Sequence, residues 1–197
     1  GMALPLEKPP TFDAEAYLVW EELQAEKHEY INGEVFAMVG VRQSHGTATL
    51  NFAFALRREL KGAPCRVFAE AIKTRVESRN AYFYPDVVVT CDPRDRLTPQ
   101  FISHPSLIIE ILSESTAAFD RGEKFAHYRQ LESLQEFGIV DLKAKRIEIF
   151  RRNAENHWVL YEYRPGEEFE LPSLNARISV DEIFDDTDEP SESPENV

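Results

Sequence analysis

The sequence predicts an α/β fold in which helices flank a mixed central β-sheet and a β-meander completes the C-terminal third. Two patterns lead to this prediction. In the first two thirds of the chain, segments with helical periodicity alternate with short runs of β-branched residues, as in layered α/β proteins. After residue 137, strand-like runs follow one another with only turn residues between them. The length of 197 residues fits one domain with short extensions.

The N-terminal part is expected to contain a helix, a β-hairpin and a second helix. Residues 11–27 have the partial amphipathic spacing of a surface helix. The dipeptide Asn32-Gly33 then separates two strand-like runs and predicts a tight hairpin, because both central positions of a type I′ turn need positive φ. Ser44 is a candidate cap for the second helix, which would extend to about residue 61 with apolar side chains at every fourth position.

The middle of the chain is expected to supply the central strands of the sheet. Apolar, β-branched runs predict buried strands, and Asp120 followed by Glu123 has the spacing of a helix-capping box. The predicted elements are strands over 65–76, 82–91 and 106–112, a helix from Asp120 to about Leu134, and further strands over 137–142, 146–151 and 158–163.

The C-terminal end is strongly acidic. Ser179 and Glu182 predict a last short helix, and from Asp185 onward the chain offers almost nothing to bury. The formal net charge is −13, but eight of the 35 acidic residues lie after residue 180, so charge neither requires nor excludes a nucleic-acid partner. We expect three parts, an N-terminal extension over 1–10, a single domain over 11–184 and a disordered acidic tail over 185–197.

The two cysteines, Cys65 and Cys91, lie at the edges of predicted strands and form no metal-binding spacing. Two small buried thiols in a reducing cytoplasm are the favoured interpretation, with a disulfide as the alternative. No segment is long and apolar enough to cross a membrane, and no secretory signal is recognisable. We therefore expect a cytoplasmic protein without a membrane partner.

Two lone carboxylates in apolar strands are the main signal for chemistry. Glu110 lies within the run Ile108–Leu112, and Asp86 follows Pro85 at the start of another apolar run. A buried carboxylate must be paired, protonated or bound to a metal. If the two strands pair in suitable register, Asp86 and Glu110 could converge on one Mg²⁺ or Mn²⁺ ion, since hard oxygen ligands suit both metals.

Four segments resemble the motifs of the Uma-type restriction endonuclease family, which belongs to the PD-(D/E)XK nuclease superfamily. The resemblance extends from about residue 11 to residue 184. It implies a restriction-endonuclease-like core and a Mg²⁺-dependent endonuclease that hydrolyses DNA through a metal-bound water. The segments that carry it are Tyr30–Glu34, Tyr84–Val89, Ile109–Ser113 and Asp120–Lys124.

The resemblance also implies roles for individual residues. The superfamily pattern has lysine two residues after the motif glutamate, where this chain has Leu112. The family supplies the amine from the following helix, which corresponds to Lys124. Its ammonium group would orient the attacking water or stabilise transition-state charge. Glu34 would be a third metal ligand, and Tyr128, four residues beyond Lys124 on the same helix face, a positioning group.

Two further positions depart from the family pattern. Ala71 stands where the family has an aspartate just before the strand lysine, Lys73, and Glu114 stands where the family tends to have proline. Glu70 is one residue early, and a one-residue shift points a strand side chain to the opposite face, so it is not expected to substitute. His45 is either a pocket residue or, more often for a lone histidine, a structural one.

Each assignment has a structural alternative. Asp86 could be a capping carboxylate, Glu110 an ion-pair partner of a lysine, Glu34 or Lys124 a solvated surface residue, and Tyr128 a core residue. At the level of the whole protein, the alternatives are a nuclease fold that has lost cleavage and serves as a binding or assembly module, or a metal hydrolase of another class. A homodimer is expected if both DNA strands are cut, because this needs two sites.

Overall fold

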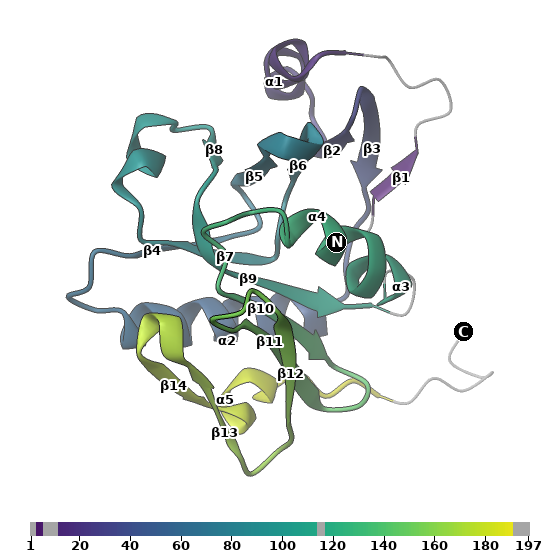
Figure 1. Ribbon diagram of the computed structural model, residues 1–197. Helices are drawn as coiled ribbons and strands as arrows, with labels where there is room; N and C mark the ends of the chain where they lie inside the picture. Colours follow the sequence, from purple (N-terminus) through teal and green to yellow (C-terminus); the bar gives the residue numbers. More distant parts are fainter. Residues whose placement is uncertain (1–2, 6–11, 114–116, 191–197) are drawn as a thin grey trace.

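The computed structural model describes residues 3–5, 12–113 and 117–190 and consists of two six-stranded β-sheets, a two-stranded sheet and short helices (Figure 1). Helices flank the mixed sheet that contains the central strands, so the predicted α/β class is confirmed. The second large sheet was not predicted. Across the described ranges, no helix is long and apolar enough to cross a lipid bilayer.

The N-terminal sheet is built around the predicted hairpin. Asn32 and Gly33 have φ values of 45° and 98°, which places the turn where the sequence predicted it. Helix α1 (Ala14–Glu22) packs on this sheet through Tyr17, and its cap is Asp13, whose side chain accepts a hydrogen bond from the Ala16 amide at 2.8 Å. The strand order is β1 (Ala3–Pro5), β3 (Glu34–Met38), β2 (His28–Ile31), β6 (Ala81–Phe83), β5 (Lys73–Val76) and β8 (Phe101–Ile102).

The central sheet is mixed, because β9 and β10 pair in parallel whereas the other neighbours pair antiparallel. Its order is β12 (Trp158–Tyr163), β11 (Arg146–Arg152), β10 (Glu136–Asp141), β9 (Pro105–Leu112), β7 (Val87–Thr90) and β4 (Arg66–Ala69). The antiparallel run β10–β11–β12 is the expected meander. Short 3₁₀ turns at Glu77–Arg79, Pro93–Leu97 and Pro172–Leu174 join the strands.

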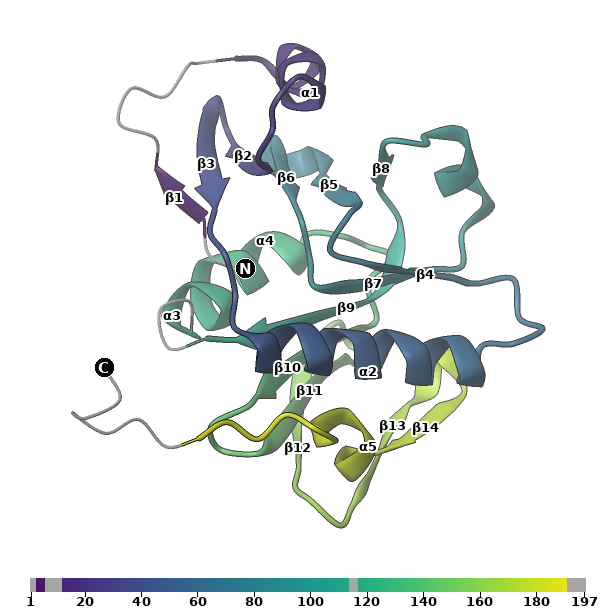
Figure 2. The same ribbon diagram turned by 180° about the vertical axis from the view of Figure 1, so that it is seen from behind.

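Each face of the central sheet is covered by a different layer (Figures 1 and 2). One face packs against α2 (Gln43–Glu59), the hairpin β13 (Glu168–Leu171) and β14 (Ala176–Ser179), and α5 (Val180–Phe184). The other face packs against one continuous helical segment made of α3 (Ala117–Phe119), the π-helix η3 (Asp120–Lys124) and α4 (Phe125–Tyr128). The hairpin β13–β14 was not predicted.

Two predicted strands are each divided between the two large sheets. The run 65–76 forms β4 and β5, and the run 82–91 forms β6 and β7. Both crossings occur at the same place, where the Glu70 amide donates a hydrogen bond to the Asp86 carbonyl at 3.0 Å. Pro85 lies in the second crossing and has no N–H to offer to a sheet ladder. The sequence predicted the strands correctly but missed the point where the chain changes sheets.

Two helix starts differ from the prediction. Ser44 lies inside the first turn of α2, because the helix begins at Gln43 after Arg42, which makes no side-chain cap hydrogen bond. Asp120 is not a cap either, since helical structure already begins at Ala117 and continues through a π-helical turn. The predicted helix ends at Tyr128 instead of Leu134.

The segment after α5 also differs from the expected disordered tail. Thr187 is 4% exposed, and its hydroxyl donates a hydrogen bond to the Phe184 carbonyl at 2.7 Å. Lys145 contacts the Thr187 hydroxyl at 3.0 Å and the Asp188 carboxylate at 2.8 Å. This segment therefore contacts the domain through Thr187 and Asp188, and residues 191–197 lie outside the described residues.

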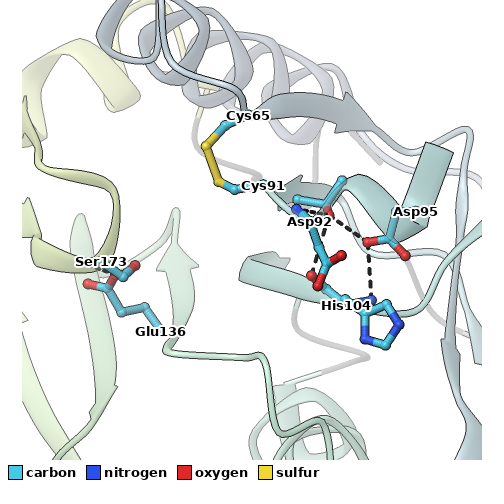
Figure 3. Close-up of a disulfide and its surroundings, with 8 residues drawn as sticks. Cys65, Cys91, Asp92, Asp95, His104, Glu136 and Ser173 are labelled. Atoms are coloured by element: carbon cyan, nitrogen blue, oxygen red, sulfur yellow. Dashed lines mark hydrogen bonds between the residues drawn. A yellow bond between two sulfur atoms is a disulfide. The ribbon is translucent and has the colours of Figure 1, made fainter.

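Cys65 and Cys91 form a disulfide instead of the two free thiols that the sequence favoured (Figure 3). The reason is the register of β4 and β7, in which Arg66 pairs with Thr90, so that the flanking cysteines lie opposite each other with their Cα atoms 4.0 Å apart. Disulfides persist in oxidising environments, so the cysteines do not support a reducing compartment.

Replacing both cysteines with alanine is expected to lower the free energy of unfolding by about 3 kcal/mol, because the disulfide closes a loop across 26 residues and restricts the unfolded chain. Denaturant titration of wild-type and variant protein, each with and without reductant, measures the effect. Reductant should destabilise the wild type alone. Equal stability of all four samples would show that the disulfide contributes nothing.

Candidate active site

The two carboxylates singled out in the sequence lie side by side where the chain passes between the sheets. Strands β7 and β9 are adjacent and antiparallel, and Val87 pairs with Ile109. In this register the residue before Val87, Asp86, lies opposite the residue after Ile109, Glu110. Asp86 is 2% exposed and Glu110 is fully buried. The amide of Ile111 donates a hydrogen bond to Asp86 Oδ2 at 2.7 Å. The strands that carry the two carboxylates are therefore neighbours, as expected.

Asp86 is held in its ionised form. Burial on its own would raise the pKa of this carboxyl group, but the imidazole of His45 and the hydrogen bond from the Ile111 amide contribute to a pKa well below its usual range. The group is thus ready to act as an anionic ligand without first losing a proton.

Asp86, His45 and Glu70 form a compact group of potential metal ligands. His45 Nε2 lies 3.3 Å from Asp86 Oδ2, and His45 Nδ1 lies 3.7 Å from Glu70 Oε1. One ligand atom from each residue falls within 4.8 Å of the others, close enough for a single ion. His45 is 4% exposed, and its Nδ1 has no hydrogen-bond partner among the described residues. A buried ring nitrogen without a hydrogen-bond partner is suited to coordinate a metal ion.

Glu70 reaches this group because it does not belong to a regular strand. Strand β4 ends at Ala69, and Glu70 has a φ of 59°, in the left-handed region that non-glycine residues seldom adopt. The alternation argument that excluded Glu70 holds only within a continuous strand, so it fails here. Its side chain is 40% exposed and gives the otherwise buried group an opening to solvent.

Lys124 contacts Glu110 and is itself fully buried. Its Nζ is 3.8 Å from Glu110 Oε2 and 3.3 Å from Glu29 Oε2, and both carboxylate side chains are fully buried as well. The Tyr128 hydroxyl donates a hydrogen bond to Glu110 Oε1 at 3.0 Å. Lys124 and Tyr128, both predicted site residues, therefore both contact Glu110.

Lys73, the strand lysine that follows Ala71, has a different environment. Its Nζ lies 5.5 Å from the centre of the Tyr84 ring, and burial lowers the pKa of its ammonium group against the opposing effect of Glu21 and Glu22. Lys27 lies over the same ring at 5.3 Å and donates a hydrogen bond to the Glu70 carbonyl at 3.0 Å.

Glu29, not Glu34, is the additional carboxylate that the structure brings to the site. Glu34 is exposed at the start of β3, beside the hairpin turn. Glu29 is fully buried in the middle of β2 and accepts a hydrogen bond from the Tyr84 amide at 2.8 Å, in addition to its contact with Lys124. The criterion that identified Glu110, a lone carboxylate in an apolar run, missed Glu29 because the polar residue His28 precedes it in β2.

Comparisons with known proteins match the chain to one family. Residues 14–181 match the family model Uma2, described as "Putative restriction endonuclease". Two similar proteins come from Synechocystis sp. (strain ATCC 27184 / PCC 6803 / Kazusa). "Uncharacterized protein slr1290" is 37% identical over 89% of this chain and 92% of its own length, and "Uncharacterized protein sll1609" is 34% identical over 80% and 90%.

A solved structure shares the fold. It is a protein from Anabaena variabilis ATCC 29413 described as "a putative nuclease belonging to DUF820", with a TM-score of 0.70 and 17% sequence identity. The alignment covers 88% of this chain and 97% of that one. Because the family model matches residues 14–181, most of the chain, the chain belongs to the Uma2 family.

Proposed function

We propose that this protein is a metal-dependent endonuclease that hydrolyses phosphodiester bonds in DNA, with Mg²⁺ or Mn²⁺ as its cofactor. The observation that carries the proposal is the position of the His45–Glu70–Asp86 group directly beside the buried Glu110–Lys124 pair, across two paired strands. Family membership supports the same reaction class.

The three residues His45, Glu70 and Asp86 would hold the metal. A bound divalent ion would lower the pKa of a coordinated water and neutralise charge on phosphate oxygens. Two carboxylates alone would suit Mg²⁺ and Mn²⁺ equally, but imidazole is a softer ligand that Mg²⁺ accepts reluctantly. The donor set therefore favours Mn²⁺ over Mg²⁺ as the better activator.

Lys124 would stabilise the negative charge that develops on the phosphorus centre. Glu29 and Glu110 fix its ammonium group from two sides, and Tyr128 fixes Glu110 in turn. A cation that is already oriented and shielded from bulk water needs little reorganisation as charge develops. Lys124 would thus supply the amine of the site, although Leu112 stands where the superfamily pattern has its lysine. It favours an active nuclease over a binding module that has lost cleavage.

Cleavage of supercoiled plasmid and of labelled oligonucleotides tests the proposal. We expect cleavage with Mn²⁺, weaker cleavage with Mg²⁺, and none in EDTA. The matched control is Glu155→Gln, which removes an exposed acid from the loop between β11 and β12 and should leave cleavage unchanged. Cleavage that persists in EDTA would contradict the proposal, and DNA binding without cleavage under all metals would support the inactive binding module. Linear product formed in one binding event would support the proposed homodimer.

A further inference from the structure

The first turn of α2, which carries His45, holds a carboxylate from a distant part of the chain. Glu189 Oε2 lies 2.9 Å from Nε of Arg42, and Glu189 Oε1 accepts a hydrogen bond from the Ser44 amide at 3.3 Å. Arg42 makes no side-chain cap of its own at this helix end. At this helix end, an anion 145 residues away in sequence thus binds both an amide donor and an arginine.

Several contacts hold the segment that carries Glu189 along α2. The Asn51 side chain donates hydrogen bonds to the Ile183 carbonyl at 3.0 Å and the Asp185 carbonyl at 2.8 Å, and Lys145 donates one to the hydroxyl of the buried Thr187 at 3.0 Å. The segment therefore passes along α2 from its middle toward its N-terminal end, as Figure 2 shows in yellow. The hydrogen bond from Ser44 and the nearby Arg42 lower the pKa of the Glu189 carboxyl, so that it is bound as an anion.

We propose that Arg42 and the Ser44 amide form a binding site for a backbone phosphate of the DNA, and that Glu189 occupies this site until DNA displaces it. A phosphate, like a carboxylate, binds to guanidinium groups and to the amides at a helix N-terminus. The site is one residue from His45, whose buried ring contacts Asp86 at 3.3 Å. A phosphate bound there would lie beside the reaction centre. The inference rests on the proposed function, because it assigns a substrate contact to the same active site.

The C-terminal segment would therefore compete with the substrate at a defined position, beyond any general repulsion between its acidic residues and DNA. Asp188 separates the two effects, because it carries the same charge one residue away but pairs with Lys145 and is 92% exposed. General repulsion predicts equal effects of neutralising Asp188 or Glu189, whereas competition for one site predicts an effect of Glu189 alone.

The test measures binding of a labelled DNA duplex by fluorescence anisotropy in Ca²⁺ across a salt series, using full-length variants. We expect Glu189→Gln to tighten binding by about twofold to fivefold, as for one exposed charge-assisted contact, and Asp188→Asn to change it little. Arg42→Ala should weaken binding and lower the slope of log affinity against log salt by about 0.9, and Glu189→Gln should have no further effect in that background. Inorganic phosphate should compete with the DNA less well after Arg42→Ala.

Equal effects of Glu189→Gln and Asp188→Asn, or an unchanged gain from Glu189→Gln in the Arg42→Ala background, would overturn the inference. So would stronger binding of free phosphate by Glu189→Gln without any change in DNA affinity. Melting temperatures show whether each variant is folded, and Arg42→Lys replaces Arg42→Ala if the latter is not. If the affinity pattern appears but no metal supports cleavage, the proposed nuclease function fails while the phosphate site stands. If cleavage occurs and the pattern is absent, only the phosphate site fails.

Discussion

Asp86→Asn is expected to lower the single-turnover rate of DNA cleavage on the order of a thousandfold, the largest effect of any single replacement in this chain. Asp86 contacts both the potential ligand His45 and the strand that carries Glu110. Asparagine keeps an oxygen for the Ile111 amide but loses the negative charge that would hold the metal. The folded structure should therefore survive while the metal site is lost.

Metal-dependent stabilisation gives this prediction a readout that does not depend on activity. Mn²⁺ at a hundred times its dissociation constant should stabilise the wild type by about 2.7 kcal/mol and leave Asp86→Asn unchanged. In EDTA Asp86→Asn should melt below the wild type, because the lowered pKa of Asp86 means that its charge stabilises the fold at neutral pH. Equal stabilisation of both by Mn²⁺ would place the metal somewhere other than Asp86.

Lys124→Met is expected to slow cleavage by about a hundredfold to a thousandfold and to destabilise the fold by about 3–5 kcal/mol. The two effects have different causes. The first is the loss of the cation next to the reacting phosphate. The second arises because Glu29 and Glu110 are fully buried and would lose their shared positive partner. Lys73→Met, which removes another buried lysine, is the matched control and should retain cleavage.

A double variant separates the two effects of Lys124. Glu29→Gln removes one of the two carboxylates that Lys124 neutralises, so Lys124→Met with Glu29→Gln should regain part of the stability but none of the cleavage. Stability comes from urea titration and cleavage from single-turnover kinetics in Mn²⁺. Full activity of Lys124→Met, or loss of activity in Lys73→Met alone, would reverse the assignment of the amine.

The features that the sequence predicted well are those set by local pattern. The Asn32-Gly33 turn needs only two residues with positive φ, and both have it. Asp86 and Glu110 stood out because a charge in an apolar strand is costly wherever that strand lies. Their side-by-side placement followed once β7 and β9 proved to be neighbours.

The features that the sequence missed depend on contacts between distant segments. Glu70 was excluded by strand alternation, which ends where the chain crosses between the sheets. The disulfide depends on the register of β4 with β7, and 26 residues of spacing say nothing about that register. Glu189 looked like part of an unpacked tail because its partners, Arg42 and Ser44, lie at the opposite end of the sequence.

The central claim is that a divalent ion binds at Asp86 beside the Glu110–Lys124 pair, and locating that ion tests it most directly. Anomalous scattering from crystals of the full-length protein grown with Mn²⁺ should show a peak within about 2.5 Å of Asp86 and of at least one ligand atom of His45 or Glu70. Asp86→Asn crystals should lack the peak. A well-ordered Asp86 with no peak nearby in the wild type, or a strong peak at another group of residues, would contradict the account.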